Sequence, residues 1–159
     1  MNTLTTVTVV FALIGSALIG GIFFAFSSFI MKALARLPSS EGIAAMQSIN
    51  VVVLNPVFLG VFMGTAVISL LVSILAIRGW EMPAAPYYLV GALFYFVGTF
   101  LVTGMGNVPL NNQLAAVTVN DPAASDFWQH YLDRWTRLNT IRTVSSTVAA
   151  VMILIGLLK

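Results

Sequence analysis

The feature that most limits the fold of this chain is a stretch of thirty residues, 2–31, without a single charged side chain. A helix needs roughly 20 apolar residues to cross the hydrocarbon core of a bilayer. The stretch is too long for the apolar core of a signal peptide, and no basic segment precedes it. It therefore predicts a membrane span, and similar stretches follow. The predicted spans are 5–30, 51–77, 86–105 and 138–158.

The composition supports one compact membrane domain over 1–159. Only 8% of the residues are charged, 59% are hydrophobic and the mean hydropathy is +0.99, whereas soluble domains carry about 25% charged residues. No basic run is present that would neutralise several phosphates, so nucleic acid is excluded as a partner. Cysteine is absent and histidine occurs once, which argues against a transition-metal site. We expect neither a metal nor a cofactor.

A long polar segment, 106–137, separates the third and fourth spans. Within it, apolar side chains recur on one helical face, namely Phe127, Trp128, Tyr131, Leu132 and Trp135. His130 falls on the opposite, polar face, where exposure to water is the simpler expectation and a role as general base is the alternative. This pattern predicts an amphipathic helix over 123–137, lying at the interface as a lid. The predicted fold is therefore all-α: an integral membrane four-helix bundle with an additional interfacial helix between spans 3 and 4.

Most of the unusual polar residues fall on one side of the predicted bundle. In a four-span chain the first and third connections share a side, and the carboxamides near them are Asn50, Asn55, Asn107, Asn111, Asn112 and Asn139. Asn55 precedes Pro56, so a simple helix kink is the alternative to a polar cavity wall there. The three carboxamides of the 107–112 segment are equally consistent with a turn.

A polar stripe runs down the fourth span. Trp135, Asn139, Arg142 and Ser146 are spaced by four, three and four residues, which places them on one helical face. An arginine inside the membrane edge either reaches out to lipid phosphate or finds polar partners. Because the stripe is itself polar, we expect Arg142 to face inward and to hydrogen-bond an asparagine of 107–112.

Three short stretches carry a resemblance to a known family. They are Ile49-Asn50 with Asn55-Pro56-Val57-Phe58, then Asn107-Val108-Pro109-Leu110-Asn111-Asn112, and finally residues 135–143, from Trp135 to Thr143. The chain resembles the anthrone oxygenases, small four-span membrane proteins, over nearly its whole length. Many members place histidine where this chain has Thr140, so a base at that position is missing here.

The resemblance implies oxidation of an anthrone to an anthraquinone by molecular oxygen, without a known cofactor. Such a reaction needs donors for a developing oxyanion and an aromatic slot. The candidate catalytic residues are Arg142, Asn139, Asn107, Asn111 and His130. The candidate substrate-binding residues are Asn50, Asn55, Phe58, Asn112, Trp128, Trp135 and Ser146. The expected ligand is a flat phenolic, anthrone-type or quinol-like molecule.

Two other functions remain open on the sequence. One is a non-catalytic accessory subunit that binds a quinone or lipid, either as a homo-oligomer or in a larger membrane complex. The other is a small transporter, which the lack of acidic residues inside the spans disfavours. Small residues on the spans, such as Gly60, Gly64, Gly91 and Gly98, indicate either close helix packing or room for a ligand. Membrane lipid surrounds the protein in each case, and a bacterial inner membrane is the expected location.

Overall fold

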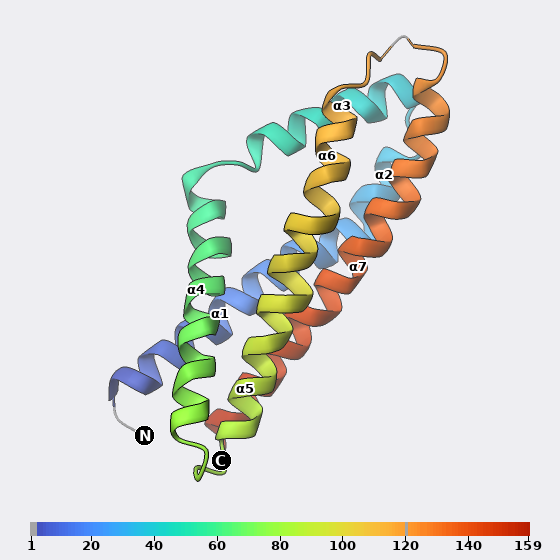
Figure 1. Ribbon diagram of the computed structural model, residues 1–159. Helices are drawn as coiled ribbons and strands as arrows, with labels where there is room; N and C mark the ends of the chain where they lie inside the picture. Colours follow the sequence, from blue (N-terminus) through green and yellow to red (C-terminus); the bar gives the residue numbers. More distant parts are fainter. Residues whose placement is uncertain (1–2, 120) are drawn as a thin grey trace.

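The computed structural model of the chain describes residues 3–119 and 121–159, and every regular element in these ranges is a helix (Figure 1). Three of the elements, denoted η, are π-helical, with a wider turn than an α-helix. In chain order the elements are α1 (Thr3–Ala25), η1 (Phe26–Ile30), α2 (Met31–Leu34), α3 (Ser39–Val52), α4 (Pro56–Arg78), α5 (Ala85–Leu93), η2 (Phe94–Leu101), η3 (Thr103–Asn107), α6 (Val108–Ala115) and α7 (Ala124–Leu157).

The predicted four-span, all-α fold is confirmed. Within the described ranges, four continuous helical stretches are long and apolar enough to cross a membrane: Thr3–Leu34, Pro56–Arg78, Ala85–Ala115 and Ala124–Leu157. Each contains one of the predicted spans or overlaps most of it. The chain is therefore a multi-pass membrane protein.

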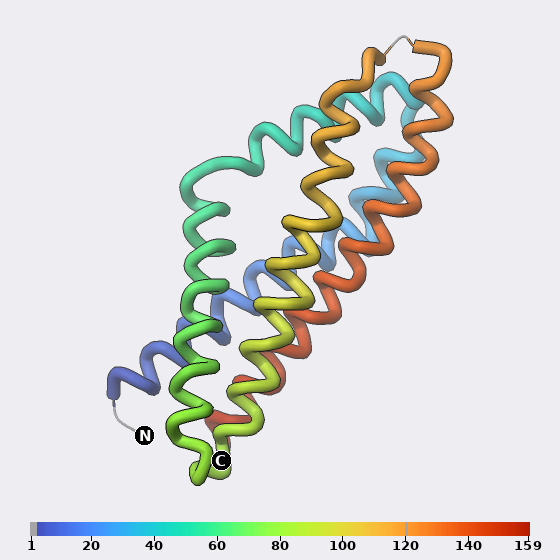
Figure 2. Tube along the Cα trace, in the orientation of Figure 1, coloured from blue at the N-terminus to red at the C-terminus, as the bar shows by residue number. Residues whose placement is uncertain are grey.

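The helices form an elongated bundle with two different ends. In Figure 1, α1 begins and α7 ends at the lower end, while α2, α3, α6 and the first turns of α7 meet at the upper end. We call this upper end the motif end. The tube in Figure 2 shows that α3 runs across it, from the end of the first span to the start of α4. The first and third connections thus lie at the same end, as predicted.

The third span is longer than predicted. The segment 107–112, expected as a turn, is helical, and the helix continues through Pro109 to Ala115. A proline inside an α-helix clashes with the preceding turn. Here η3 ends two residues before Pro109, and the backbone N–H of Val108 donates a hydrogen bond to Thr103 O, five residues back. The wider turn accommodates the ring, so the helix does not end there.

The predicted separate lid helix over 123–137 is wrong. This segment is helical, but it is the first part of the uninterrupted 34-residue helix α7, and residue 120 of the predicted polar segment lies outside the described ranges. Its apolar face was placed correctly, since Trp128, Tyr131 and Trp135 are buried, and His130 is exposed as expected. These rings pack against α2, α3 and α6, so the segment lies along the bundle as part of α7 and not across its end as a lid (Figure 1). The helix that crosses the motif end is α3.

The small residues serve the packing only in part. Cβ atoms added at Gly91 and Gly98 would meet Ile153 and Ser145 of α7, so these two glycines permit close helix contact. By contrast, an added Cβ at Gly21, Gly60 or Gly64 would meet nothing within 4 Å in the described structure. The packing role predicted for Gly60 and Gly64 is therefore wrong for the isolated chain.

Candidate functional site

The polar stripe of the fourth span faces the interior, as predicted. Trp135, Asn139, Arg142 and Ser146 are all buried, and Arg142 is only 4% exposed. Two guanidinium nitrogens of Arg142 donate hydrogen bonds: Nη2 to Asn139 Oδ1 at 2.7 Å and Nη1 to Thr103 Oγ1 at 3.2 Å. The expected bond to an asparagine of 107–112 is wrong, because Thr103 occupies the facing position on the third span.

Aromatic rings cover the guanidinium. Its Cζ lies 4.0 Å from the centroid of the Phe23 ring and 5.1 Å from that of Trp135. Such contacts are attractive because the ring face is electron-rich, and the attraction grows when water is excluded. Arg142 is thus held by two polar groups and two rings, all from inside the bundle.

The charge of Arg142 has no acidic partner among the described residues. The only ion pair found there joins Arg137 Nε to Asp133 Oδ1 at 2.9 Å, with both side chains mostly exposed. In addition, Arg142 Nε and Asn107 Oδ1 are buried and have no hydrogen-bond partner in the described structure. Buried polar atoms are nearly always paired. The site therefore holds one buried donor and one buried acceptor that no residue of the described structure pairs.

Asn139 links Arg142 to the first span. Its Nδ2 donates to Phe23 O and to Ser27 Oγ, both at 2.7 Å, while its Oδ1 accepts from Arg142. The hydroxyl of Ser27 lies 3.1 Å from that of Thr140. A chain of hydrogen bonds therefore runs from the surface position Thr140 through Ser27 and Asn139 to the buried guanidinium.

The third span contributes a second polar row, Thr99, Thr103 and Asn107. Thr99 Oγ1 lies 2.8 Å from Ser146 Oγ, and Asn107 Nδ2 donates to Trp135 O at 3.3 Å. This row lies in η2 and η3, and Ser27 lies in η1. Thr103, which accepts a hydrogen bond from Arg142, and Ser27, which accepts one from Asn139, thus both lie in π-helical turns, a feature often found at functional sites.

Asn111 organises the aromatic residues of the motif end. Its Oδ1 accepts from Tyr131 Oη at 2.9 Å and from Trp135 Nε1 at 2.8 Å. Asn50 Nδ2 reaches Tyr131 Oη at 3.4 Å. The rings of Trp128 and Tyr131 are stacked at 5.6 Å, and those of Tyr131 and Trp135 at 6.3 Å.

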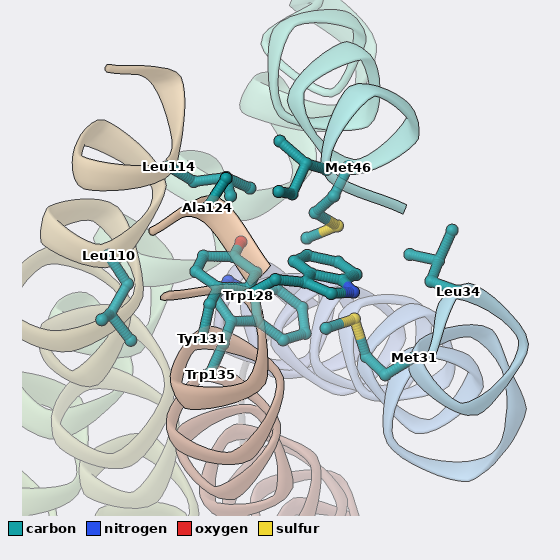
Figure 3. Close-up of a cluster of buried hydrophobic side chains, with 10 residues drawn as sticks. Met31, Leu34, Met46, Leu110, Leu114, Ala124, Trp128, Tyr131 and Trp135 are labelled. Carbon is teal, nitrogen blue, oxygen red and sulfur yellow. The ribbon is translucent and has the colours of Figure 1, made fainter. Parts of the chain in front are cut away.

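Figure 3 shows this ring stack from the side of α7, with the thioethers of Met31 and Met46 on either side of Trp128. The predicted residues Asn50, Asn111, Trp128 and Trp135 are thus brought together.

Phenylalanines form a second aromatic group beside Arg142. Phe62 packs against Phe23 at 6.5 Å, Phe58 at 5.8 Å and Phe100 at 5.7 Å between ring centroids. Phe58 and Phe100 are half-buried, whereas Phe23 and Phe62 are buried. The predicted residue Phe58 therefore lies two rings from the guanidinium, at the partly exposed end of this group.

Three predicted residues lie apart from Arg142. His130 and Asn112 are exposed. Asn55 caps α4, with its Oδ1 accepting from Phe58 N at 3.0 Å, which is the ordinary role of asparagine at a helix start.

A large apolar groove of about 520 Å³ lies between the third span and α7. Its wall includes Leu138 and Gly106, but Arg142 does not line it.

Sequence analysis missed four residues that contact the buried polar groups: Phe23, Ser27, Thr99 and Thr103. A usable signal was present for two of them. Thr99, Thr103 and Asn107 are spaced by four residues within an apolar span, which places the three on one helical face. Phe23 gave no signal, because an aromatic ring in a membrane span is expected anywhere.

Comparison with known proteins gives one match. A family model described as Anthrone oxygenase matches residues 57–152. This range includes the 107–112 and 135–143 stretches and Arg142, but it begins after Asn50 and Asn55. Searches of curated proteins and of solved structures found no match.

Proposed function

The chain belongs to the anthrone oxygenase family, and on that premise we propose that it is a cofactor-independent oxygenase acting on a flat phenolic molecule of anthrone type. The observation that supports this most directly is the buried guanidinium of Arg142, which lacks an acidic partner among the described residues and lies against two aromatic rings. A phenolate would supply the missing negative charge, and its flat ring system suits an aromatic environment.

In this proposal the protein acts mainly through electrostatics. An anthrone has an acidic CH₂ group, because loss of a proton gives an aromatic phenolate. Arg142 stabilises that anion, and Asn107 Oδ1 is free to accept a hydrogen bond from a further hydroxyl of the ligand. His130 is exposed, so no side chain is assigned as the base and the proton passes to water.

The oxidation then proceeds between the two bound reactants. The phenolate transfers one electron to O₂, and the resulting carbon radical and superoxide combine to form a peroxide. Protonation of the peroxide and loss of water leave the second carbonyl of the quinone. One O₂ is consumed for each quinone and each water formed, so no external reductant is required.

The test is turnover by the purified chain in detergent. With emodin anthrone as substrate, we expect quinone absorbance to rise faster than the spontaneous reaction and one O₂ to be consumed per quinone. An anaerobic sample serves as the control. A rate equal to the spontaneous background would refute the oxygenase proposal.

A second candidate function is that of a non-catalytic quinone- or lipid-binding subunit. The outward glycines Gly21, Gly60 and Gly64 favour it, because small residues on a lipid-facing surface permit close approach of another membrane helix. In that case the chain should co-purify with a stable partner in mild detergent. Emodin should then quench the tryptophan fluorescence of the chain without any turnover of its anthrone.

A further inference from the structure

A second groove, which Arg142 does not line, lies between the first span and α7 at the motif end. It has a volume of about 430 Å³. Residues of η1, α2 and the first half of α7 line it, among them Ser27, Met31, Lys32, Leu132, Arg137 and Thr140. The α2 and α7 side chains that form it come from segments that lie far apart in the sequence, so the groove exists only in the folded bundle.

The lining of the groove includes two basic side chains. Lys32 and Arg137 carry positive charge, and Asp133 is the one acidic residue that lines it, which gives the lining a net charge of +1. The hydrogen bond that Arg137 donates to Asp133 uses its Nε. The two terminal nitrogens of that guanidinium therefore stay available, in the planar arrangement that suits phosphate oxygens.

The rest of the lining combines hydroxyl groups with apolar side chains. Ser27 and Thr140 place two hydroxyls 3.1 Å apart in its lining, and hydroxyls donate readily to phosphate or glycerol oxygens. Met31, Ala35 and Leu132 form an apolar wall. One ligand with a phosphate, a polar backbone and a hydrocarbon tail would match the basic, hydroxyl and apolar groups of this lining.

We propose that this groove binds the headgroup of an anionic phospholipid, with the phosphate between Lys32 and Arg137. Its depth in the membrane favours a lipid over a soluble phosphate compound. Lys32 lies two residues before Leu34, where the first span ends, and basic residues at the ends of spans lie at the headgroup level. Basic grooves between membrane helices are known to bind anionic headgroups.

The test is native mass spectrometry of the full chain released from mild detergent. Phosphatidylglycerol and phosphatidylcholine with identical acyl chains are compared at equal concentration. We expect phosphatidylglycerol to be retained at one site. Loss of both charges in Lys32→Gln/Arg137→Gln should weaken its binding roughly thirtyfold.

Two further variants make the assignment specific to the groove. Arg36→Gln/Arg78→Gln removes the same number of charges from exposed positions outside the groove, and it should bind as well as the unaltered chain. Ala35→Trp keeps every charge but fills the groove, and it should bind at least tenfold more weakly. Circular dichroism confirms that each variant remains helical.

Several outcomes would overturn the proposal. Equal loss of binding in the two charge variants would mean that surface charge alone attracts the lipid. Unchanged binding in Ala35→Trp would place the lipid elsewhere. Displacement by millimolar inorganic phosphate would show that a free anion, and not a lipid, is the ligand. None of these measurements depends on turnover, so the result is independent of the oxygenase proposal.

Discussion

Arg142 places a buried charge in the bundle's interior without an acidic partner among the described residues. Placing an arginine at the centre of a membrane helix costs about 2.5–3.5 kcal/mol. Each hydrogen bond to a charged group contributes about 1.5–3 kcal/mol, and each ring contact about 0.5–2 kcal/mol. The two bonds and two rings around Arg142 are therefore of the right order to hold the charge in place.

Two substitutions of Arg142 should separate the effect of its positive charge on the rate from the effect of its planar hydrogen-bonding geometry. Arg142→Leu should lower quinone formation by about 10²–10³-fold, the usual effect of removing one donor to a developing oxyanion. Arg142→Lys should lose only about tenfold, because it keeps the charge but cannot hold Asn139 and Thr103 in one planar contact. Rates of quinone formation measure both effects.

Arg78 provides the matched control. It is exposed and is the last residue of α4, at the end of the bundle away from the motif end. Arg78→Gln should react at the unaltered rate. Equal activity of the Arg142→Leu variant and the unaltered chain would exclude Arg142 from the reaction.

Two adjacent asparagines allow a clean test of the aromatic group at the motif end. Asn111→Leu leaves the buried donors of Tyr131 and Trp135 without their acceptor, so the free energy of unfolding should fall by about 2–4 kcal/mol. Asn112 is exposed, and Asn112→Leu should change it by less than about 0.5 kcal/mol. Unfolding in detergent, followed by tryptophan fluorescence, measures both. Equal effects of the two changes would contradict the described contacts.

The direction of Arg142 could be predicted from the sequence, but its partner could not. Spacings of four, three and four residues fix which side chains of α7 share a face, whatever the neighbouring helices do. The partner depends on which face the third span presents to α7. The π-helical turns of η2 and η3 rotate that face, and no local sequence pattern predicts these turns. Thr103 therefore replaces the expected asparagine.

At the scale of helices, unequal length is the main feature. Three spans contain 32, 31 and 34 residues, whereas α4 contains 23. At 1.5 Å per residue α4 is about 34 Å long, close to the thickness of a bilayer core, and α7 is about 51 Å long. The long helices thus extend beyond the hydrocarbon at the motif end. The helix α3 spans the distance from them to the start of α4.

The continuity of α7 explains the failed lid prediction. An amphipathic stretch beside a membrane span has the same pattern whether its apolar face meets lipid or protein. In this chain that face meets protein, because Leu110 and Leu114 of α6 and Met46 of α3 pack against its rings. The periodicity of one segment cannot predict long-range packing of this kind.

A distance measurement can verify that α7 is one continuous helix. The chain contains no cysteine, so spin labels can be attached at Asp126→Cys and Leu154→Cys alone, both exposed positions. A continuous helix places these positions about 42 Å apart. Double electron–electron resonance should give that distance, within the reach of the labels. A helix folded back as a lid would give a much shorter one.

At the scale of the whole molecule, the charges predict an orientation. Basic residues near span ends favour the cytoplasm. The motif end has Lys32, Arg36, Arg134 and Arg137, and the opposite end has Arg78 and Lys159. We therefore expect the motif end to face the cytoplasm and both ends of the chain to face outward.

Reporter fusions test this orientation. Alkaline phosphatase fused after Lys159 should be active in a bacterial host, and a fluorescent protein that matures only in the cytoplasm should stay dark at the same position. The opposite pair of signals would reverse the orientation. A fusion within the short connection after Arg78 should behave like the one after Lys159, since the two positions lie at the same end of the bundle.

The depth of Arg142 has a consequence for how occupancy must be measured. Arg142 lies 15 residues before the last residue of α7, about 22 Å along the helix axis, which is inside the hydrocarbon layer that α4 crosses. A ligand of this site dissolves in the bilayer before it meets the protein. Its mole fraction in the lipid, and not its molarity in water, then sets how often the site is filled. Adding empty vesicles or micelles at a fixed amount of ligand would dilute it in two dimensions, and turnover would slow although nothing in the aqueous phase had changed.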